Sequence, residues 1–299
     1  MTRAFFVVNP AAGGGRGRRV WARLETRLTG LGIHFAFEET TGRGAATAIA
    51  QRAAHAGWPL VVALGGDGTV NEVVNGLVDA SGRAHATLGV IAAGRGRDVC
   101  RNFDLASDVD RAAQRLVEGR DVAVDLGLAS WGSGRRRYFL NSAGVGFDAA
   151  VAERVQASRG AGTIPYLLGI IATLRRYRPG AATIAVEDDR SAFDGPMMVA
   201  VVANGPYYGG GMKIVPAADP VDGWLDLVVV GDLGKLELLR WLPSVYRGTH
   251  LSHRKVTTRR GRTFSIGGPG RLLVHVDGES VEASPVVMTV CQGALRIRR

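Results

Sequence analysis

The first part of the chain alternates short apolar runs with segments whose apolar residues recur at helical spacing. The apolar runs predict strands at 4–8, 34–38, 60–64 and 88–91, and helices are predicted at 18–28, 45–56, 70–77 and 109–117. In the first helix Val20, Trp21, Leu24 and Leu28 fall on one face. Strands that alternate with helices in this way are typical of a parallel α/β sheet.

From about residue 122 the pattern changes to short β-rich runs separated by glycine, proline and aspartate. Such runs are typical of an antiparallel β-sandwich. The predicted strands are 138–141, 183–186, 198–203, 225–230, 264–266, 272–276 and 286–290, and helices are predicted at 164–177 and 236–246. The fold class predicted is therefore α/β plus β, in two domains.

Composition adds a strongly basic character, with a formal charge of +10 that is nearly all arginine. A basic surface indicates an anionic partner, which could be nucleic acid, an acidic membrane face or a phosphorylated ligand. The sequence contains neither an RNP strand nor a paired Cys/His pattern, and its basic residues are scattered, so we expect no nucleic-acid partner.

Two cysteines, Cys100 and Cys291, can build neither a disulfide framework nor a cysteine zinc site, which fits a reducing cytoplasm. The opening AFFVV is too short for the core of a signal peptide. The longest apolar helix candidate, 164–174, is far below the roughly 20 residues that span a bilayer. We therefore expect a cytoplasmic protein that is not embedded in a membrane.

The segment VVALGGDGTVNEVVNG, residues 61–76, carries the most chemical information. Glycines between a strand and a helix let the backbone approach phosphate oxygens, and the helix start supplies free N–H groups. Asp67 would repel phosphate unless it serves a metal or an acceptor hydroxyl, so it favours transfer chemistry. The plainer alternative is a tight turn whose aspartate caps the next helix.

A second glycine-rich loop, residues 9–15, occupies the same kind of strand-to-helix junction. Parallel strands bring such loops together at one edge of the sheet, where ligands bind. Two loops of this type favour a phosphate site more strongly than either does alone.

Taken in order, these motifs resemble the diacylglycerol kinase catalytic family, which includes bacterial soluble lipid kinases, sphingosine kinases and ceramide kinases. The matching segments are VVNPAAGG, TTGRGAA, GGDGTVNEVVNG, LGVIAAGRGRD, VDLG, FLNSAGVGFDA, DPVDGWLDLVVV and VHVDGES. The glycine-aspartate core is shared with NAD kinases and phosphofructokinase-like enzymes. The N-E pair that follows it and the late D-G-E are lipid-kinase features.

The resemblance implies an ATP-binding parallel α/β domain over 1–122 plus a C-terminal return at 287–299, and a β-sandwich lipid-acceptor domain over 123–286, with a cleft between them. It also implies a magnesium-dependent lipid kinase that transfers the γ-phosphate of ATP to a lipid hydroxyl, most directly diacylglycerol to phosphatidic acid. The alternatives are an NAD-kinase-like enzyme with a soluble acceptor and a catalytically impaired protein that binds nucleotide or lipid.

The resemblance assigns roles residue by residue. Asp67 would face the γ-phosphate and the catalytic magnesium, Asp98 completes the catalytic set, and Glu279 would accept the proton of the lipid hydroxyl. Asp222, with main-chain oxygens of Asp219 and Trp224, matches the family's structural magnesium site, to which Asp125 is linked. The residues expected to hold ATP are Asn9, Pro10, Gly13, Thr40, Gly65, Gly66, Asp67, Gly68, Thr69, Asn71, Glu72, Gly94 and Arg95.

One loop departs from the family pattern. Where the family usually has G-T-G/A-N-D, this chain has Gly94-Arg95-Gly96-Arg97-Asp98. Two guanidinium groups could grip phosphate bidentately. They could also indicate a different nucleotide, an acidic acceptor, or binding without catalysis.

The predicted helix 164–177 carries Leu167, Leu168, Ile171, Leu174 and Tyr177 on one broad face, ahead of arginines at 175, 176 and 178. This pattern suits an interfacial helix that meets an anionic membrane, and equally a core-facing helix with a solvated basic end. Basic clusters at 135–137 and 254–262 could add about 1 kcal/mol per charge over headgroups, although solvated loop charge explains them more plainly.

We expect a lipid substrate reached at a membrane surface through peripheral contact, and the resemblance suggests a homodimer. His250 and His253 are expected on the surface, and Cys100 is expected in the core.

Overall fold

The computed structural model describes residues 2–157, 163–187 and 189–299, with the side chains of 155–157, 163–167 and 189–191 also left out. The chain forms two compact units, Met1–Asp125 with Gly293–Arg299, and Leu126–Gln292. We call them the α/β unit and the sandwich unit. The units meet along the chain after residues 125 and 292, a few residues beyond the boundaries expected after residues 122 and 286.

The α/β unit contains a parallel sheet in the order β17-β4-β3-β1-β2. Its strands are β1 (Arg3–Val8), β2 (His34–Glu39), β3 (Leu60–Gly65), β4 (Thr87–Ala92) and the end of β17 (Val286–Arg298). Its helices are α1 (Ala12–Gly30), α2 (Ala45–His55), α3 (Asp67–Leu77), α4 (Asp98–Asn102) and α5 (Val109–Glu118). The parallel α/β prediction is confirmed.

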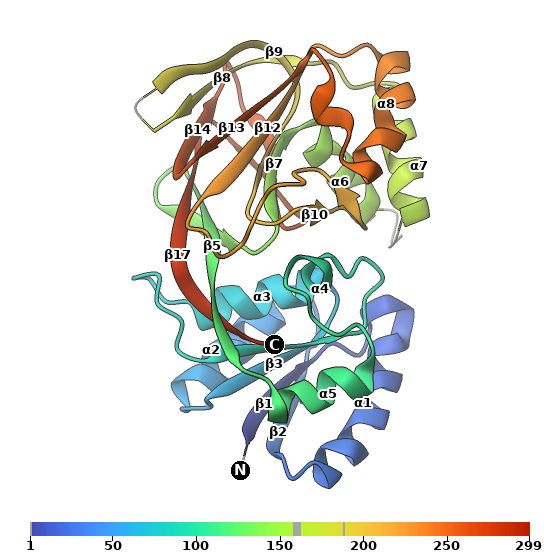
Figure 1. The fold of residues 1–299 in the computed structure, drawn as a ribbon, viewed down its shortest axis with the longest axis vertical. Coiled ribbons are helices and arrows are strands. Elements are labelled where there is room, and N and C mark those ends of the chain that lie inside the picture. The colour runs from blue at the N-terminus through green and yellow to red at the C-terminus, as the bar shows by residue number, and fades with distance from the viewer. Residues whose placement is uncertain (1, 158–162, 188) are drawn as a thin grey trace. The chain divides into compact units, whose positions relative to one another are not determined.

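Helices cover both faces of this sheet, which explains why β3 and β4 are apolar at nearly every position and fully buried. One core forms where Phe6 and Leu64 pack with Trp21 and Leu24 of α1 and with Leu116 of α5. Side chains alternate along a strand, so the neighbouring positions face the other layer, where α2 and α3 contact each other and the sheet. Figure 1 shows the two helix pairs.

The sandwich unit is antiparallel throughout its described pairs. The long strand β9 (Asp189–Ala203) pairs with β8 through its first half and with β7 and β12 through its second half. The other strands are β5 (Asp121–Trp131), β6 (Arg135–Phe139), β7 (Ser142–Gly146), β8 (Gly180–Val186), β10 (Tyr207–Tyr208), β11 (Met212–Lys213), β12 (Leu225–Gly231), β13 (Val256–Gly261), β14 (Thr263–Gly267), β15 (Leu272–Val276) and β16 (Glu279–Ala283). The sandwich prediction is confirmed.

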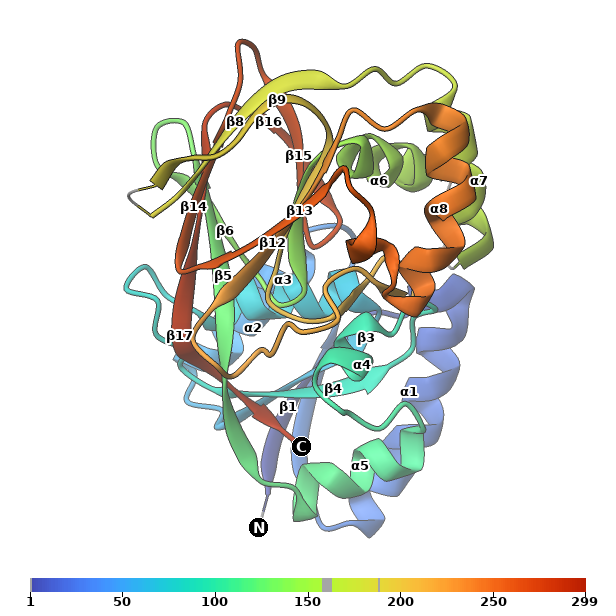
Figure 2. The same ribbon diagram turned by 45° about the horizontal axis from the view of Figure 1, so that its top comes forward.

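Three helices belong to the sandwich unit: α6 (Phe147–Ala157), α7 (Thr163–Leu174) and α8 (Lys235–Arg247). Neither α6 nor α4 was predicted from the sequence. Helices α7 and α8 lie side by side in Figure 1 and Figure 2, and Lys235 Nζ donates a hydrogen bond of 2.8 Å to the main-chain oxygen of Arg175. Among the described residues we find no helix with the length and apolar character needed to cross a membrane.

Candidate functional site

The glycine loops follow β1, β3 and β4, so they meet at the carboxyl edge of the parallel sheet. Asn9 Nδ2 donates a hydrogen bond of 2.9 Å to Thr69 Oγ1, and Asn9 Oδ1 accepts one of 3.1 Å from the N–H of Ala11. Ala93 N–H donates to the oxygen of Gly65 over 2.8 Å. These bonds hold three of the predicted phosphate loops against one another.

The loops approach so closely that two positions admit only glycine. A Cβ on Gly13 would overlap the main-chain oxygen of Ala93, and Gly13 also has a φ of +62°. A Cβ on Gly94 would lie 2.5 Å from the Cα of Gly66. Gly68, in contrast, faces open space at the start of α3, because a Cβ there would meet nothing within 4 Å.

Asp67 is the first residue of α3, but its carboxylate does not cap that helix. Its Oδ1 accepts a hydrogen bond of 3.0 Å from the N–H of Val99 in α4. The alternative of an aspartate that caps its own helix is therefore wrong. A Cβ on Gly96 would lie 2.5 Å from Oδ2, so glycine at 96 keeps that oxygen clear. Asp67 thus joins the Gly65–Thr69 loop to the loop that carries both arginines.

Asp98 is buried at the start of α4, where its Oδ1 accepts a hydrogen bond of 2.9 Å from Arg101 Nη1. Arg97 adopts a left-handed conformation with φ 59°. Arg95 is exposed, and its Nη2 lies 3.5 Å from the position that a Cβ on Gly14 would take. The guanidinium group of Arg95 therefore lies beside the first glycine loop. Cys100 is buried as expected, and burial raises the pKa of its thiol to about 11.

Two of the other predicted ATP ligands join structural elements, and a third bonds within its own helix. Thr40 N–H donates to the oxygen of Val8 over 2.8 Å. Glu72 Oε2 accepts a hydrogen bond of 3.2 Å from Ala46 N–H at the start of α2. Asn71 is buried, and its Oδ1 accepts from Asn75 Nδ2 over 3.2 Å. Their roles toward ATP stay predictions.

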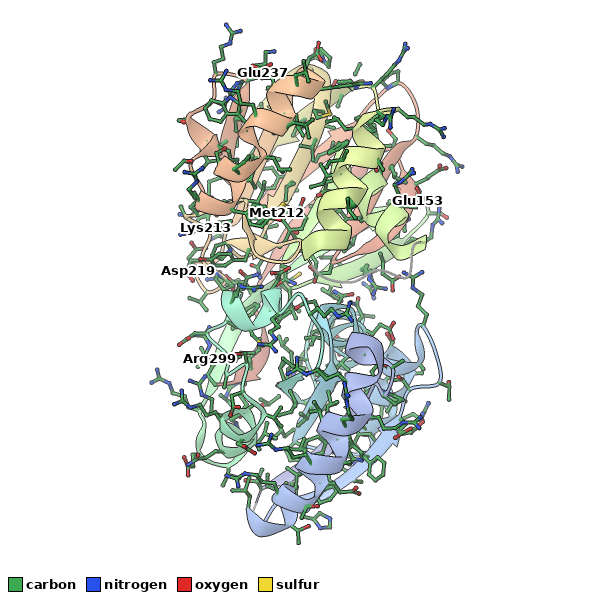
Figure 3. All side chains as sticks on the ribbon, turned by 90° about the vertical axis from the view of Figure 1, so that its right-hand side faces the viewer. Glu153, Met212, Lys213, Asp219, Glu237 and Arg299 are labelled. Atoms are coloured by element: carbon green, nitrogen blue, oxygen red, sulfur yellow. The ribbon has the colours of Figure 1, made fainter. Side chains whose placement is uncertain are left out.

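The sandwich unit holds a cavity of about 100 Å³ between its sheet and helices α6, α7 and α8. Figure 3 looks onto α7 and α8 and labels Met212, which lines this cavity and whose strand β11 contacts α8. The lining is almost entirely apolar, with branched aliphatic side chains from β9 and β12. The main lining residues are Val151, Ile170, Val199, Val201, Val230, Leu238, Trp241, Leu242 and Val245.

A buried polar cluster adjoins this cavity. Asp148, which lines the cavity near the start of α6, accepts a hydrogen bond of 2.8 Å from the Tyr208 hydroxyl and lies 2.8 Å from His275 Nε2, both at Oδ2. Burial lowers the pKa of His275, but the charge of Asp148, the hydrogen bond with it and the charge of Asp277 together raise that pKa above its usual value. This cluster was not predicted from the sequence, where its signal was a histidine at an inward position of an apolar strand.

The D-G-E-S segment forms a tight hairpin between β15 and β16. Asp277 accepts hydrogen bonds from the N–H groups of Leu140, Asn141 and Ser142 over 2.7, 3.1 and 3.0 Å. Glu279 begins β16, is partly exposed, and its Oε1 lies 3.3 Å from Arg137 Nη2. The predicted base therefore lies at the start of strand β16, directly after the hairpin turn.

The predicted structural magnesium residues lie in a turn of the sandwich unit. Asp222 Oδ1 accepts from Trp224 N–H over 3.0 Å, and Oδ2 is paired with Arg260. Asp219 Oδ1 accepts from Val221 N–H over 3.2 Å. Asp125 is buried in the α/β unit and accepts from Gly293 N–H over 2.7 Å. No cluster of three or more His, Cys, Asp or Glu suited to a metal occurs among the residues with described placement.

Arg260 already neutralises Asp222, so this turn fits a cation only if the arginine moves away. The magnesium assignment at Asp219, Asp222, Trp224 and Asp125 stays a prediction.

One surface expectation is wrong. His250 and His253 are buried and line the cavity, because the short helix η1 (His250–Ser252) folds under α8. The single apolar face expected for 164–177 is divided: Leu174 is buried, whereas Leu168 and Ile171 are exposed. The side chain of Leu167 lies outside the described residues.

The chain thus combines glycine loops at the edge of a parallel sheet in one unit with an apolar cavity in a β-sandwich unit. Residues 3–129 match the family described as "Diacylglycerol kinase catalytic domain", and residues 141–299 match "YegS C-terminal NAD kinase beta sandwich-like domain". The chain belongs to the diacylglycerol kinase catalytic family.

Relatives agree with this assignment, and a solved structure has the same fold. A diacylglycerol kinase of Mycobacterium tuberculosis is 31% identical over 245 residues, which cover 81% of this chain and 77% of that one. A diacylglycerol kinase of Staphylococcus aureus is 29% identical over 93% of this chain and 86% of that one. A solved protein from Bacillus anthracis has a TM-score of 0.81 at 23% identity over 99% of this chain and 94% of that one, which shows a shared fold.

Proposed function

We propose that the protein is an ATP- and magnesium-dependent lipid kinase, which transfers the γ-phosphate of ATP to the hydroxyl of a lipid. The observation that carries this proposal is the apolar cavity of the sandwich unit, whose aliphatic lining suits a hydrocarbon chain. It disfavours the NAD-kinase-like alternative, because a dinucleotide acceptor needs a polar surface. Since relatives are named diacylglycerol kinases, diacylglycerol is the first acceptor to test.

The α/β unit supplies groups that suit the binding of a nucleoside triphosphate. Gly68 leaves open space at the start of α3, where free N–H groups favour phosphate. Arg95 adds a positive charge beside the first glycine loop. Magnesium, when bound with ATP, neutralises charge on the phosphates. The clear Oδ2 of Asp67 fits such a cation.

Glu279 is the proposed acceptor of the proton that leaves the lipid hydroxyl. Arg137 and the hairpin orient its carboxylate. A positioned carboxylate base contributes about 10²–10⁴-fold to such a reaction. The larger contributions come from positioning and charge compensation.

We further propose that helices α7 and α8 meet an anionic membrane. Leu168 and Ile171 of α7 and Leu236 and Leu239 of α8 are exposed, although they are large and apolar. Exposed cations accompany them at Arg175, Arg176, Arg178, Lys235 and Arg240. Apolar side chains beside basic ones suit the interface of an anionic bilayer.

Labelled ATP, magnesium and dioleoylglycerol in mixed micelles test the proposed reaction, with the product identified by mass spectrometry. The expected product is phosphatidic acid. The host's own lipid extract is the second substrate, in case the acceptor is another lipid alcohol. Formation of NADP with no lipid product would select the soluble-acceptor alternative, and ATP binding without any product would select a binding protein.

A further inference from the structure

Arg137 of β6 forms an ion pair with Glu279, the proposed base. Its Nη2 lies 3.3 Å from Glu279 Oε1, and the two side chains are 19% and 32% exposed, so a ligand can reach both. Asp277, the other carboxylate of the hairpin, is already bonded to three consecutive N–H groups. Arg137 therefore lies beside a carboxylate whose charge the proposed reaction changes.

The backbone around this pair is tied together. The base follows the two-residue turn Asp277-Gly278, in which both residues have a positive φ, 45° and 90°, as the type I′ turn of a hairpin requires. The N–H groups that Asp277 binds belong to residues 140–142, directly after the strand that carries Arg137. The arginine and the base therefore come from two segments that one buried carboxylate joins.

The proposed transfer reverses the charges beside this guanidinium group. The lipid O–H bond breaks, and its proton passes to Glu279, which becomes neutral. The electron pair of that bond forms the new bond to the γ-phosphorus, while the bond from phosphorus to the bridging oxygen breaks and its electrons leave on ADP. The carboxylate thus loses its negative charge as the lipid gains a phosphate with about two.

The new phosphate forms within reach of Arg137. A base acts at about 2.6–3.2 Å from the oxygen whose proton it takes. The guanidinium nitrogen is 3.3 Å from the carboxylate, and the transferred phosphorus is bonded to that lipid oxygen. A rotation of the long arginine side chain is enough to bring its planar donors to the phosphate, which they match bidentately.

We propose that Arg137 is a catalytic residue that leaves Glu279 and binds the phosphoryl group once this group has been transferred to the lipid. This inference rests on the proposed lipid kinase function. It requires Arg137 to distinguish a phosphate ester from the parent alcohol, which an ion pair with a purely structural role does not do.

Short-chain soluble lipids measure this distinction without a membrane. The probes are dihexanoylphosphatidate and dihexanoylglycerol, each titrated by calorimetry in the absence of nucleotide. Arg137→Met keeps most of the aliphatic stem and removes the charge. Arg136→Met is the matched control, because it removes the same charge from the opposite face of β6.

We expect Arg137→Met to weaken binding of the phosphatidate at least about tenfold and binding of the glycerol less than about twofold, since charge-assisted hydrogen bonds are strong. Arg136→Met should leave both affinities unchanged. Arg137→Lys, which keeps the charge without the planar fork, should lie between Arg137→Met and the unmodified protein, and it carries the test if Arg137→Met does not fold. Equal loss on the ester and the alcohol would overturn the inference.

Glu279→Gln mimics the protonated base and tests the change of partner. It should tighten binding of the phosphatidate at least about threefold, because Arg137 loses its charged partner and the phosphate loses a repelling charge. The gain should be smaller when Glu279→Gln is combined with Arg137→Met, since only the repulsion is then relieved. A gain of the same size in both backgrounds would show that Arg137 does not change partner.

The kinase assay separates this inference from the proposed function. If no lipid is phosphorylated, but Arg137→Met weakens binding of the phosphatidate and Arg136→Met does not, the kinase proposal fails and the phosphate site at Arg137 stands. If dioleoylglycerol is phosphorylated and all the arginine variants bind the phosphatidate as tightly as the unmodified protein, the kinase stands and the role of Arg137 falls.

Discussion

Asn9 and Thr69 are joined by a hydrogen bond of 2.9 Å from Nδ2 to Oγ1, although they lie 60 positions apart in the chain. The bond ties the loop after β1 to the first turn of α3. The contact of Gly94 with Gly66 ties the loop after β4 to the same place. The edge of the sheet is therefore organised by its own contacts, which suits phosphoryl transfer because that chemistry depends on positioning.

Two glycines of this edge should respond differently to alanine. Gly94→Ala places a Cβ 2.5 Å from the backbone of Gly66, so we expect loss of about 1–3 kcal/mol in the free energy of unfolding and loss of ATP binding. Gly68→Ala meets no atom within 4 Å, so stability should be kept while the KM for ATP rises. Urea unfolding and ATP titration measure both effects. Unchanged ATP binding in Gly68→Ala would contradict the assignment of phosphate to this space.

The arginine loop yields a second prediction. Arg97 has φ 59° and ψ 29°, a left-handed conformation that asparagine adopts more readily than arginine. Arg97→Asn, which restores the family's residue, should therefore raise the free energy of unfolding by about 0.5–1 kcal/mol. Arg95→Thr, beside Gly14, should instead raise the KM for ATP with little change in stability. If neither variant changes the KM for ATP, the two arginines do not bind its phosphates.

Membrane contact should depend on the exposed leucines of α8. Leu236 is 84% exposed, so Leu236→Ser combined with Leu239→Ser should not disturb folding. We expect these changes to weaken binding to phosphatidylglycerol vesicles about tenfold, as apolar burial in the interface is lost. Val221→Ser, at an exposed apolar residue elsewhere on the sandwich unit, is the control and should bind normally. If Val221→Ser weakens vesicle binding as much as the double leucine variant does, α7 and α8 are not the membrane-binding surface.

His275 makes stability depend on pH. Its pKa lies above the ordinary 6.5 in the folded protein, as the opposing effect of burial is outweighed by Asp148 and Asp277. Its stabilising contribution is therefore complete below about pH 6.5 and lost as pH rises through the raised pKa. The difference in unfolding free energy between the unmodified protein and His275→Gln should shrink over that range, by at most about 1.4 kcal/mol per pH unit. If this difference in unfolding free energy instead grows as the pH rises, the pKa of His275 is not raised in the folded protein.

The parallel sheet and the sandwich could be predicted from repeating apolar patterns, because strands buried on both faces and alternating strands have distinct signatures. The glycine loops could also be predicted, since only glycine allows backbones to meet as Gly94 and Gly66 do. Asp148 could not, because its importance comes from a contact with His275, 127 positions later. The burial of His250 and His253 was missed for the same reason: tertiary packing under α8 overrides local polarity.

Asp67 and Glu279 are proposed to serve one transfer reaction. Asp67→Asn keeps the oxygen that accepts from Val99 but removes the charge, and Glu279→Gln keeps the shape of the proposed base. The direct measurement is the rate of γ-phosphate transfer from labelled ATP to lipid in both variants, with ATP binding measured in parallel. We predict that each variant binds ATP and loses at least about 10²-fold in rate. Transfer at the unmodified rate by either variant would contradict the account.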